Sequence, residues 1–331
     1  MEFKCGLIGL GRIGCGFDDK PNLHSINTHA GAYSTSKRAK LVALCDIDEA
    51  KLTKYGKKYG VQKLYKSYSE MFKNEKLDCV SICTLADSHL PIVEEAAKYN
   101  IKGIFLEKPI SDELVDATKI VDICKENKIK LQIDHQRRFD PFYQKIKNII
   151  NDKEFGKIQH VSIYYGGGIL NTCIHIFDLL RFFFGEVIWV EGRISTNSSN
   201  NTLDPNIDGI ITCKNDVRCI LQGFNLKNYG ILELDIFGEK QRLRLNLMNS
   251  TVEYFVVFHS DQSLVYDELT PKQYSFPASV DAIVLGLENL FDSIENDVEL
   301  HCKGDDGRAA LKVVKSMMDS ADKNGNRVMI Y

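Results

Sequence analysis

The sequence predicts two domains of different class: an N-terminal α/β domain on a parallel sheet, and a C-terminal α+β domain with a large, mostly antiparallel open sheet. Three observations support this prediction. Strand patterns alternate with helix patterns over about the first 120 residues, as they do in βαβ units. A glycine-rich turn follows the first strand, and strand patterns succeed one another without helices from residue 187 to residue 276.

The first domain, expected over residues 1–121, begins with this alternation. Short apolar runs predict parallel strands at residues 3–8, 40–45, 79–84 and 103–106. Amphipathic patterns predict helices at residues 28–36, 49–59, 69–74, 91–99 and 112–127. This spacing is typical of strands that helical crossovers join into one parallel sheet.

The second domain, expected over residues 122–331, begins with one more strand at residues 130–133. A helix at 141–151, a strand at 159–165 and an apolar helix at 169–184 follow it. After the strand-rich region, amphipathic helices at 279–294 and 305–321 close the chain. Successive strands without intervening helices indicate a mostly antiparallel sheet.

Composition excludes several classes of protein. The 331 residues carry 42 Lys and Arg against 45 Asp and Glu, a net charge of −3, so we expect no nucleic acid partner. No stretch approaches the ~20 apolar residues of a membrane helix, and the N-terminus lacks signal-peptide organisation. The ten cysteines form no CxxC pair and no zinc-type spacing with histidine, so we expect no metal site and a reducing, cytoplasmic location.

A glycine-rich motif, GLGRIG at residues 9–14, directly follows the first predicted strand. In the GxGxxG pattern, backbone N–H groups approach a pyrophosphate and the next helix contributes its positive N-terminal end. Its place at the first strand-to-helix turn favours a dinucleotide site over a plain glycine turn. We therefore predict that the cofactor contacts Gly9, Gly11, Arg12, Ile13 and Gly14.

Asp46 ends the second predicted strand, where a carboxylate accepts hydrogen bonds from both ribose hydroxyls and repels a 2′-phosphate. We therefore expect NAD as the cofactor, with NADP less favoured; the alternative is that Asp46 caps the helix at 49–59. Asp46 lies 32 residues beyond Gly14, against the usual ~20. Residues 17–27 account for the surplus and predict an inserted loop, in a position to cover cofactor or substrate.

Lys108 follows the strand at 103–106, at the carboxyl edge where open α/β sheets bind ligands. A lysine there can hydrogen-bond a substrate hydroxyl or relay a proton. The alternative is an ordinary surface turn before Pro109.

A polar stripe crosses the otherwise apolar helix at 169–184. Asn171, His175 and Asp178 recur at a spacing that places them on one face. They are either paired core groups or the floor of a site, and three polar residues in one stripe favour the site. Cys173 points away from the stripe, and we predict that it is buried packing.

Together these residues resemble the Gfo/Idh/MocA family of NAD(P)-dependent oxidoreductases, over essentially the whole chain. The resemblance rests on short motifs in the family's order: GLGRIG at 9–14, TLADSH at 84–89, EKP at 107–109, QRRFDP at 136–141, GGILNTCIHIFD at 167–178 and DDGRAALK at 305–312. It implies a Rossmann domain followed by an α+β domain. It also implies a sugar or polyol substrate, and dimers or tetramers formed through the open sheet of the second domain.

The resemblance also implies roles for residues of this chain. Lys108 would touch both nicotinamide and substrate, His175 would be the acid/base residue, and the Lys108–Pro109 peptide is often cis in the family. Substrate contacts would come from Asn171, Arg138 and Asp178. Further cofactor contacts would come from Ile47, Thr84, Leu85, His89, Glu107 and Gln136.

One departure from the family pattern bears on the substrate. Polyol-oxidising members carry Asp where this chain has Asn171, and an amide neither holds a charge nor passes a proton. Asn171 still offers a donor and an acceptor to a hydroxyl or N-acetyl group. We therefore expect an NAD-dependent dehydrogenase that oxidises a secondary hydroxyl of a sugar, with a nucleotide-linked amino sugar or uronate favoured. A free polyol or monosaccharide dehydrogenase and a catalytically silent NAD-binding regulator stay open as alternatives.

Overall fold

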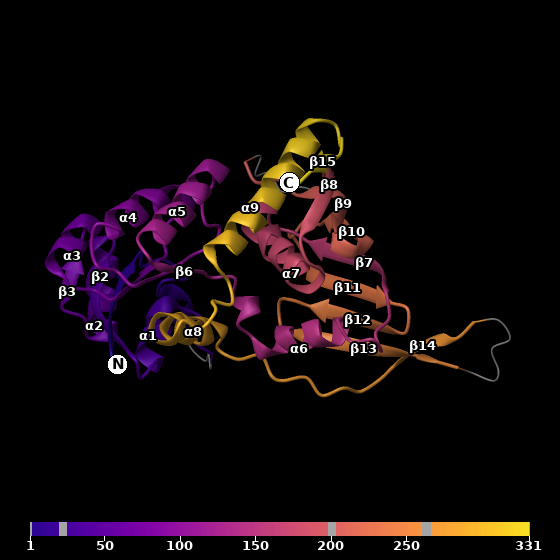
Figure 1. The fold of residues 1–331 in the computed structure, drawn as a ribbon, viewed down its shortest axis with the longest axis horizontal. Coiled ribbons are helices and arrows are strands. Elements are labelled where there is room, and N and C mark those ends of the chain that lie inside the picture. Colours follow the sequence, from indigo (N-terminus) through magenta and orange to yellow (C-terminus); the bar gives the residue numbers. More distant parts are fainter. Residues whose placement is uncertain (1, 20–24, 198–202, 260–265, 331) are drawn as a thin grey trace. The chain divides into compact units, whose positions relative to one another are not determined.

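A computed structural model of the chain describes residues 2–19, 25–197, 203–259 and 266–330. The chain forms two compact units, labelled by element in Figure 1. The first consists of Met1–Asp140 with Val280–Ala309, and the second of Pro141–Ser279 with Ala310–Tyr331. Among the described residues, no helix combines the length and the apolar character needed to cross a membrane.

The first unit is built on a six-stranded parallel sheet with the strand order β3-β2-β1-β4-β5-β6. Its strands are β1 (Phe3–Ile8), β2 (Ala39–Cys45), β3 (Lys63–Tyr65), β4 (Cys79–Ile82), β5 (Gly103–Leu106) and β6 (Lys130–Ile133). The direction of strand progression reverses between β1 and β4. The loops after these two strands are therefore neighbours at the carboxyl edge, where open α/β sheets bind ligands.

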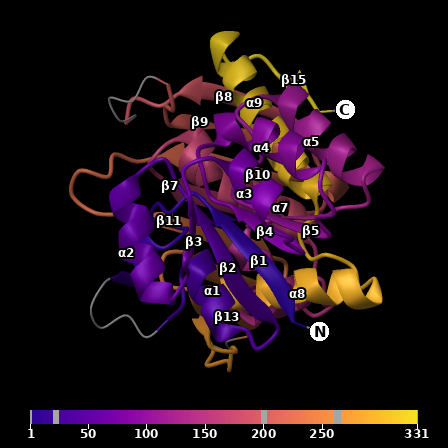
Figure 2. The same ribbon diagram turned by 90° about the vertical axis from the view of Figure 1, so that its left-hand side faces the viewer.

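Helices cover both faces of this sheet (Figures 1 and 2). They are α1 (His29–Thr35), α2 (Glu49–Tyr59), α3 (Tyr68–Asn74), α4 (His89–Ala96), α5 (Leu114–Glu126) and α8 (Ala282–Asn296). α8 comes from late in the chain and packs against α1, β5 and β6. Phe291 of α8 stacks on Phe3 of β1 with ring centroids 4.3 Å apart. The core of the first unit is thus completed by a segment that follows most of the second.

The border between the units differs from the one expected at residue 121. That residue lies inside α5, and the strand expected to open the second domain is β6, which pairs in parallel with β5. The units divide instead after Asp140. An apolar strand pattern does not reveal which sheet the strand joins, because that depends on pairing with a distant segment.

The second unit is built on a nine-stranded sheet with the order β14-β13-β12-β11-β7-β10-β9-β8-β15. Its strands are β7 (Ile158–Tyr165), β8 (Val187–Ile194), β9 (Ile207–Cys213), β10 (Val217–Gly223), β11 (Leu232–Gly238), β12 (Gln241–Asn246), β13 (Thr251–Phe258), β14 (Glu268–Pro271) and β15 (Val328–Met329). Paired strands are antiparallel except β7 and β10, which run parallel. The predicted mostly antiparallel sheet is confirmed.

The helices of this unit pack on one face of its sheet. They are α6 (Pro141–Ile150), α7 (Ile174–Phe184) and the part of α9 (Gly304–Asp322) from Ala310 onward. β10 distinguishes the two faces, because Cys219 and Leu221 are fully buried in this core while Ile220 between them is 39% exposed. We call the face that carries Ile220 the open face.

Candidate active site

The glycine-rich turn after β1 has no room for side chains at two of its glycines. Gly9 has a φ of +89°, and a Cβ there would lie 2.7 Å from the backbone of Cys83 after β4. A Cβ at Gly14 would collide with the carbonyl oxygen of Gly9. At Gly11, in contrast, a Cβ would meet nothing within 4 Å. Packing within the protein therefore does not require glycine at position 11. Its effect is to leave the backbone open to a ligand, as a pyrophosphate site requires.

Helix-type hydrogen bonds join the end of the glycine-rich turn to α1 across the inserted loop. The N–H groups of His29 and Ala30, at the start of α1, donate to the carbonyl oxygens of Ile13 and Gly14 at 3.1 and 3.0 Å. In an unbroken helix the fourth residue after each carbonyl would make these bonds, so residues 17–28 are looped out of it. Without these twelve residues, the spacing of 32 residues between Gly14 and Asp46 falls to the usual ~20. Residues 20–24 of the loop lie outside the described part of the chain.

Asp46 is bound to the glycine-rich turn and does not cap a helix. Its Oδ2 accepts from the N–H of Leu10 at 2.7 Å, and its Oδ1 accepts from the N–H of Asp48 at 2.9 Å. Asp48 is the cap of α2, since its Oδ1 accepts from the N–H of Ala50 at 2.9 Å. The carboxylate of Asp46 thus stands beside the open backbone of the turn, where the ribose-binding interpretation requires it.

Two large apolar side chains near the turn are exposed. Ile47, after β2, is 90% exposed, and Leu85, after β4, is 78% exposed. β2 and β4 flank β1 in the sheet, so these side chains come from the loops on either side of the turn. Exposed apolar residues beside an open backbone suit the flat face of a bound aromatic ring.

His89 contacts the loop after β4 from inside the unit. Its imidazole is buried, with Nδ1 3.1 Å from the carbonyl oxygen of Ile110 and Nε2 3.3 Å from that of Thr84. Burial lowers the pKa of His89 below its ordinary value, against the opposing effect of these two carbonyl contacts. Thr84 lies at the carboxyl edge, where its hydroxyl accepts from the hydroxyl of Ser88 at 2.7 Å. His89 therefore acts by holding the Thr84 loop.

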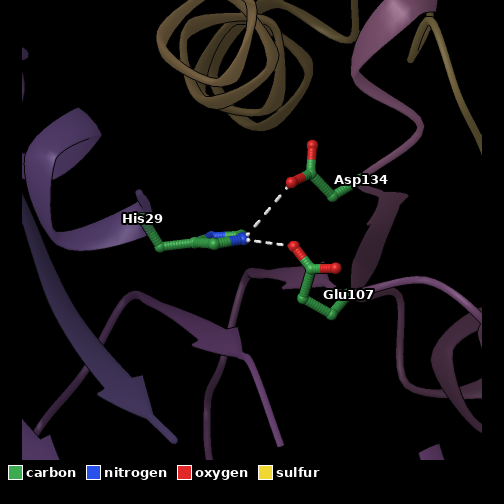
Figure 3. A group of neighbouring side chains, drawn as sticks. All are labelled: His29, Glu107 and Asp134. Carbon is green, nitrogen blue, oxygen red and sulfur yellow. Dashed lines mark hydrogen bonds and ion pairs between the residues drawn. The ribbon is translucent and has the colours of Figure 1, made fainter. Parts of the chain in front are cut away.

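Lys108 stands half-buried at the carboxyl edge after β5, and the Lys108–Pro109 peptide is cis, as the resemblance implied. The N–H of Lys108 donates to Oε2 of Glu107 at 3.1 Å. Oε1 of Glu107 lies 3.1 Å from Nε2 of His29, and that nitrogen lies 3.5 Å from Oδ2 of Asp134 (Figure 3). The carboxylate of Glu107 is therefore directed into the unit, whereas the resemblance implied a contact with nicotinamide.

The three side chains in Figure 3 form a buried ionisable cluster. Burial and the neighbouring Asp134 raise the pKa of Glu107 to about 7. Burial would lower the pKa of His29, but interactions with Cys83, Asp134 and Glu107 raise it well above its ordinary value. Burial would raise the pKa of Asp134, but hydrogen bonding to His29 lowers it. At neutral pH an imidazolium therefore faces an ionised Asp134, while Glu107 titrates.

Gln136 and Arg138 follow β6, and both are engaged within the first unit. Nε2 of Gln136 donates to Oδ2 of Asp134 at 3.1 Å. Nη1 of Arg138, a buried side chain, lies 3.2 Å from Oδ1 of Asp306 and donates to the carbonyl oxygen of His301 at 3.5 Å. This pairing gives Arg138 a structural partner within the first unit, and the substrate contact expected from the sequence stays a prediction.

In the second unit, the segment that carries the polar stripe begins with a π-helical turn, Ile169–Cys173, ahead of α7. A carboxylate from the loop before β9 caps this turn. Oδ1 of Asp204 accepts from the N–H of Leu170 at 2.7 Å, and Oδ2 accepts from that of Asn171 at 3.0 Å. Gly168, at φ +97°, leaves room for the cap, because a Cβ there would collide with the carboxylate. Asp204 therefore fixes the backbone at Asn171.

The three stripe residues differ in exposure along the segment. Asn171 is exposed, His175 is half-buried and Asp178 is fully buried. Oδ1 of Asp178 lies 3.9 Å from Nη1 of Arg181. A ligand can thus reach the amide and the imidazole, whereas the Asp178 carboxylate acts inside the unit. Cys173 is fully buried, as predicted.

Sequence reasoning missed three residues that shape these sites: His29, Asp134 and Asp204. Each supports a motif that is distant from it in the sequence, so no local pattern singles it out. Asp134 directly follows β6 just as Asp46 follows β2. That position at the carboxyl edge was the one signal that could have revealed it.

Comparison with known proteins gives two family matches. The model described as "Oxidoreductase family, NAD-binding Rossmann fold" matches residues 3–135, and the "GFO/IDH/MocA C-terminal domain" matches residues 163–244. Together they cover well over half of the chain. The chain belongs to the Gfo/Idh/MocA family.

Named relatives of this Gfo/Idh/MocA protein extend over nearly its whole length. It is 24% identical over 328 residues to the myo-inositol 2-dehydrogenase of Thermotoga maritima, which covers 93% of each chain. It is 26% identical over 344 residues to the inositol 2-dehydrogenase of Rhizobium meliloti, which covers 97% of each. The WlbA dehydrogenase of Bordetella pertussis, solved with NADH and UDP-GlcNAcA, shares the fold at a TM-score of 0.80 and 20% identity, covering 100% of this chain and 99% of that one.

The cofactor of this Gfo/Idh/MocA protein is NAD, and its first unit is an NAD-binding Rossmann domain. The open backbone at Gly11, the carboxylate of Asp46 and the exposed Ile47 and Leu85 fit such a nucleotide. The protein is an NAD-binding dehydrogenase of the sugar type, acting on CH–OH groups.

Proposed function

We propose that this dehydrogenase oxidises a secondary hydroxyl of a nucleotide-linked sugar, either an amino sugar or a uronate. The observation that carries the proposal is Asn171, an exposed amide whose backbone is held by Asp204 at the start of the polar stripe. Polyol-oxidising relatives carry a carboxylate there, by the resemblance described above. An amide does not ionise, and it offers a donor and an acceptor that match an N-acetyl group or a sugar hydroxyl.

In the proposed reaction, residues of the chain hold the substrate and take up its proton. When bound, NAD supplies the hydride acceptor, nicotinamide C4. His175 accepts the proton of the substrate hydroxyl, and Lys108 hydrogen-bonds the oxygen as negative charge develops on it. Asn171 orients the sugar ring. The glycine-rich turn holds the pyrophosphate, and Asp46 accepts hydrogen bonds from the ribose.

A free polyol is the second candidate substrate. One observation favours it: two of the proteins named above, which match 93% and 97% of this chain, are inositol dehydrogenases. Lys108 and His175 would have the same roles in either reaction. Asn171 is the residue that argues for the nucleotide-linked sugar.

We also propose that the protein forms dimers or tetramers through the open face of its large sheet. Strand pairing places aromatic and aliphatic side chains on this face: Tyr164, Trp189, Ile210, Ile220, Phe237 and Phe255. A charged pair lies among them, since Arg242 donates to both carboxylate oxygens of Asp235 at 2.8 and 2.6 Å. A face that combines apolar side chains with such a neutralised pair suits an interface between copies.

A substrate panel tests the proposed activity. The protein with NAD is mixed with UDP-, GDP- and CDP-linked sugars in one arm, and with inositols and free monosaccharides in the other, and NADH formation is followed by absorbance. We expect turnover in the first arm, and stabilisation against unfolding by about 3 kcal/mol at a sugar concentration of about 100 Kd. A higher kcat/KM for a free polyol would overturn the proposal in favour of the second candidate.

Two substitutions separate the proposed roles. His175→Ala should lower kcat about 100- to 10,000-fold, because the proton acceptor is lost, and leave NAD affinity unchanged. Asn171→Asp should lower kcat/KM for the nucleotide-linked sugar and raise that for inositol, with Asn171→Ala as the control that removes the amide without adding a charge. Wild-type kcat in His175→Ala would refute the assignment of this residue.

A further inference from the structure

The buried cluster of His29, Glu107 and Asp134 has no role in the reaction proposed above. Its members come from the start of α1, the end of β5 and the end of β6, three segments that are far apart in the sequence (Figure 3). Side-chain exposure is 1% for His29, 8% for Glu107 and 0% for Asp134. Ionisable groups buried this deeply are costly unless they are paired, so their retention calls for an explanation.

His29 is the centre of the cluster. Its Nε2 faces both carboxylates, at 3.1 Å from Oε1 of Glu107 and 3.5 Å from Oδ2 of Asp134. Its Nδ1 lies 2.9 Å from the hydroxyl of Ser81. A ring with two carboxylates at one nitrogen is stable as the imidazolium, which donates from both nitrogens. One cation is then shared between two anions.

The groups that surround His29 leave it as the cation of the cluster. Glu107 and Asp134 face it from β5 and β6, and the neutral thiol of Cys83 faces it from the end of β4, since burial raises the pKa of Cys83 to about 11. Phe105 packs edge-on at a centroid distance of 4.7 Å. Removing the imidazole would therefore leave two buried carboxylates facing each other without a positive charge.

The cluster reaches Lys108 through one carboxylate. Oε1 of Glu107 is held by His29, and this fixes the direction of Oε2, which accepts from the backbone N–H of Lys108 at 3.1 Å. The ionised carboxylate is the stronger acceptor for that N–H. A change in the charge or orientation of Glu107 would thus move the backbone from which the Lys108 side chain projects.

We propose that His29, Glu107 and Asp134 form a buried ion cluster that positions Lys108, with His29 as the positioning residue that keeps Glu107 ionised and aimed at the Lys108 amide. The proposal rests on the role of Lys108 in the proposed function. The same three side chains could instead hold a divalent cation, and the experiment below distinguishes the two.

The test compares His29→Gln and Glu107→Gln with Tyr33→Phe, using the substrate that the panel identifies. Tyr33 is a buried neighbour whose hydroxyl lies 2.7 Å from that of Ser81, so its substitution perturbs the same region without changing a charge. We expect His29→Gln to lower kcat about 10- to 100-fold, and Tyr33→Phe to change it less than about twofold. NAD affinity, measured by calorimetry, should stay within about twofold in all three variants.

The dependence of kcat on pH distinguishes positioning of Lys108 from a merely structural role of the cluster, because a structural role would not shift it. In the wild type, kcat should rise with pH as Glu107 ionises. Without the imidazolium, Glu107 ionises less readily. The rise of kcat with pH should therefore occur at higher pH in His29→Gln and be absent in Glu107→Gln. If Lys108→Ala is inactive while His29→Gln keeps the wild-type pH profile, the inference is overturned and the proposed function stands. Wild-type kcat in Lys108→Ala would refute the proposed function itself.

Two measurements on the wild-type protein keep the inference testable if His29→Gln does not fold. Nitrogen-15 NMR of the His29 ring should show both nitrogens protonated at pH 8. A neutral ring at pH 7 would overturn the proposal. Metal analysis should find no stoichiometric ion in the purified protein. One divalent cation per chain, whose removal by a chelator shifts the nitrogen-15 signals of the His29 ring, would show that the cluster is a metal site instead.

Discussion

At the scale of single residues, Gly168 illustrates how an absent side chain supports a site. The carboxylate of Asp204 occupies the space in which a Cβ of Gly168 would lie, and it caps the turn that presents Asn171. The φ of +97° at Gly168 adds a conformational reason for glycine. Asp204 and Gly168 therefore act together, because the Asp204 cap needs the space that glycine leaves at position 168.

Gly168→Ala should lose both the conformation and the cap. We expect a fall in the free energy of unfolding of roughly 3 kcal/mol, from backbone strain plus the displaced carboxylate, and a raised KM for the sugar with unchanged NAD affinity. Gly185→Ala is the matched control: Gly185 has a φ of +81° with an extended ψ, as Gly168 has, but a Cβ there would come no closer than 3.5 Å to Lys214. It should lose roughly 1 to 2 kcal/mol from backbone strain alone. Equal losses in urea unfolding would contradict the role of Asp204.

The sequence predicts residues that lie within a motif better than residues that support it. Gly11, Asp46 and Lys108 stand out in the sequence because the position of a residue at a strand end carries information about ligands, and their contacts with ligands stay predictions. His29 and Asp204 do not stand out, because each acts on a motif through a contact between distant segments. The contact of Arg138 with Asp306 could not be predicted for the same reason, since Asp306 lies far along the chain.

At the scale of elements, the inserted loop is notable because helix-type hydrogen bonds bridge its two ends. The bonds from His29 and Ala30 to Ile13 and Gly14 are those of a continuous helix. Gly31 of α1 leaves room for the carboxylate of Asp18 from the loop, with which a Cβ would collide. The loop is thus accommodated by α1 without being part of it.

Deleting residues 17–28 should therefore be tolerated. Joining Gly16 directly to His29 lets the same carbonyls accept from the same N–H groups, so we expect a thermal midpoint within about 5 °C of the wild type and NAD affinity within about threefold. Deleting residues 17–26 alone is the control, because two extra residues would break the helical register. Loss of NAD binding in the longer deletion, with the thermal midpoint unchanged, would show that the loop itself holds the cofactor.

Asp19 connects the loop to α2 and makes this connection dependent on pH. Its carboxylate accepts from Lys54 and Lys58 at 2.7 Å each and from the hydroxyl of Tyr55 at 2.8 Å. Although partial burial alone would raise the pKa of Asp19, these hydrogen bonds lower it well below its ordinary value. Asp19 therefore stabilises the fold above the ordinary carboxyl pKa of about 4, and this contribution disappears as the pH falls through the lowered value.

Asp19→Asn should cost roughly 1 kcal/mol of unfolding free energy at pH 7. The difference from the wild type should shrink steadily when urea unfolding is repeated from pH 5 down to pH 2. Glu49→Gln serves as the comparison, because Glu49 pairs with Lys66 on an exposed surface and should matter less. A cost for Asp19→Asn that is independent of pH would mean that Asp19 acts through packing and not through its charge.

Most elements could be predicted from periodicity, and the exceptions have physical causes. β1, β5, β6 and α2 occupy the predicted residues. β3 was missed because three residues, Lys63–Tyr65, are too few to show a period. The π-helical turn before α7 was missed because it depends on the cap from Asp204.

At the scale of the whole molecule, the open face should govern association. Ile220 lies near its middle and is 39% exposed, so Ile220→Glu would place an unpaired charge at the proposed interface. We expect the oligomer to dissociate at micromolar concentration in analytical ultracentrifugation. Val115→Glu, at a residue 66% exposed on α5 in the other unit, should leave the oligomer intact. A monomeric wild type, or an unaffected Ile220→Glu, would contradict the proposed interface.

The sequence predicts the class of each unit but not the path of the chain between them. The return of residues 280–309 to the first unit has no local signature, because α8 is amphipathic like any helix that packs on a sheet. Only its partners identify its place. Leu290 and Ile294 fill the space beside Gly103 of β5, where a Cβ would be too close to both side chains.

The late arrival of α8 has a consequence for the protein as it is being made. All six strands of the first sheet leave the ribosome before residue 140, yet the helix that covers β5 and β6 follows only after residue 280. At about 5–20 residues per second, the intervening stretch takes on the order of 10 s to synthesise. During that interval an unfinished nucleotide-binding unit exposes apolar surface, and it is in this window that a chaperone would find its binding site.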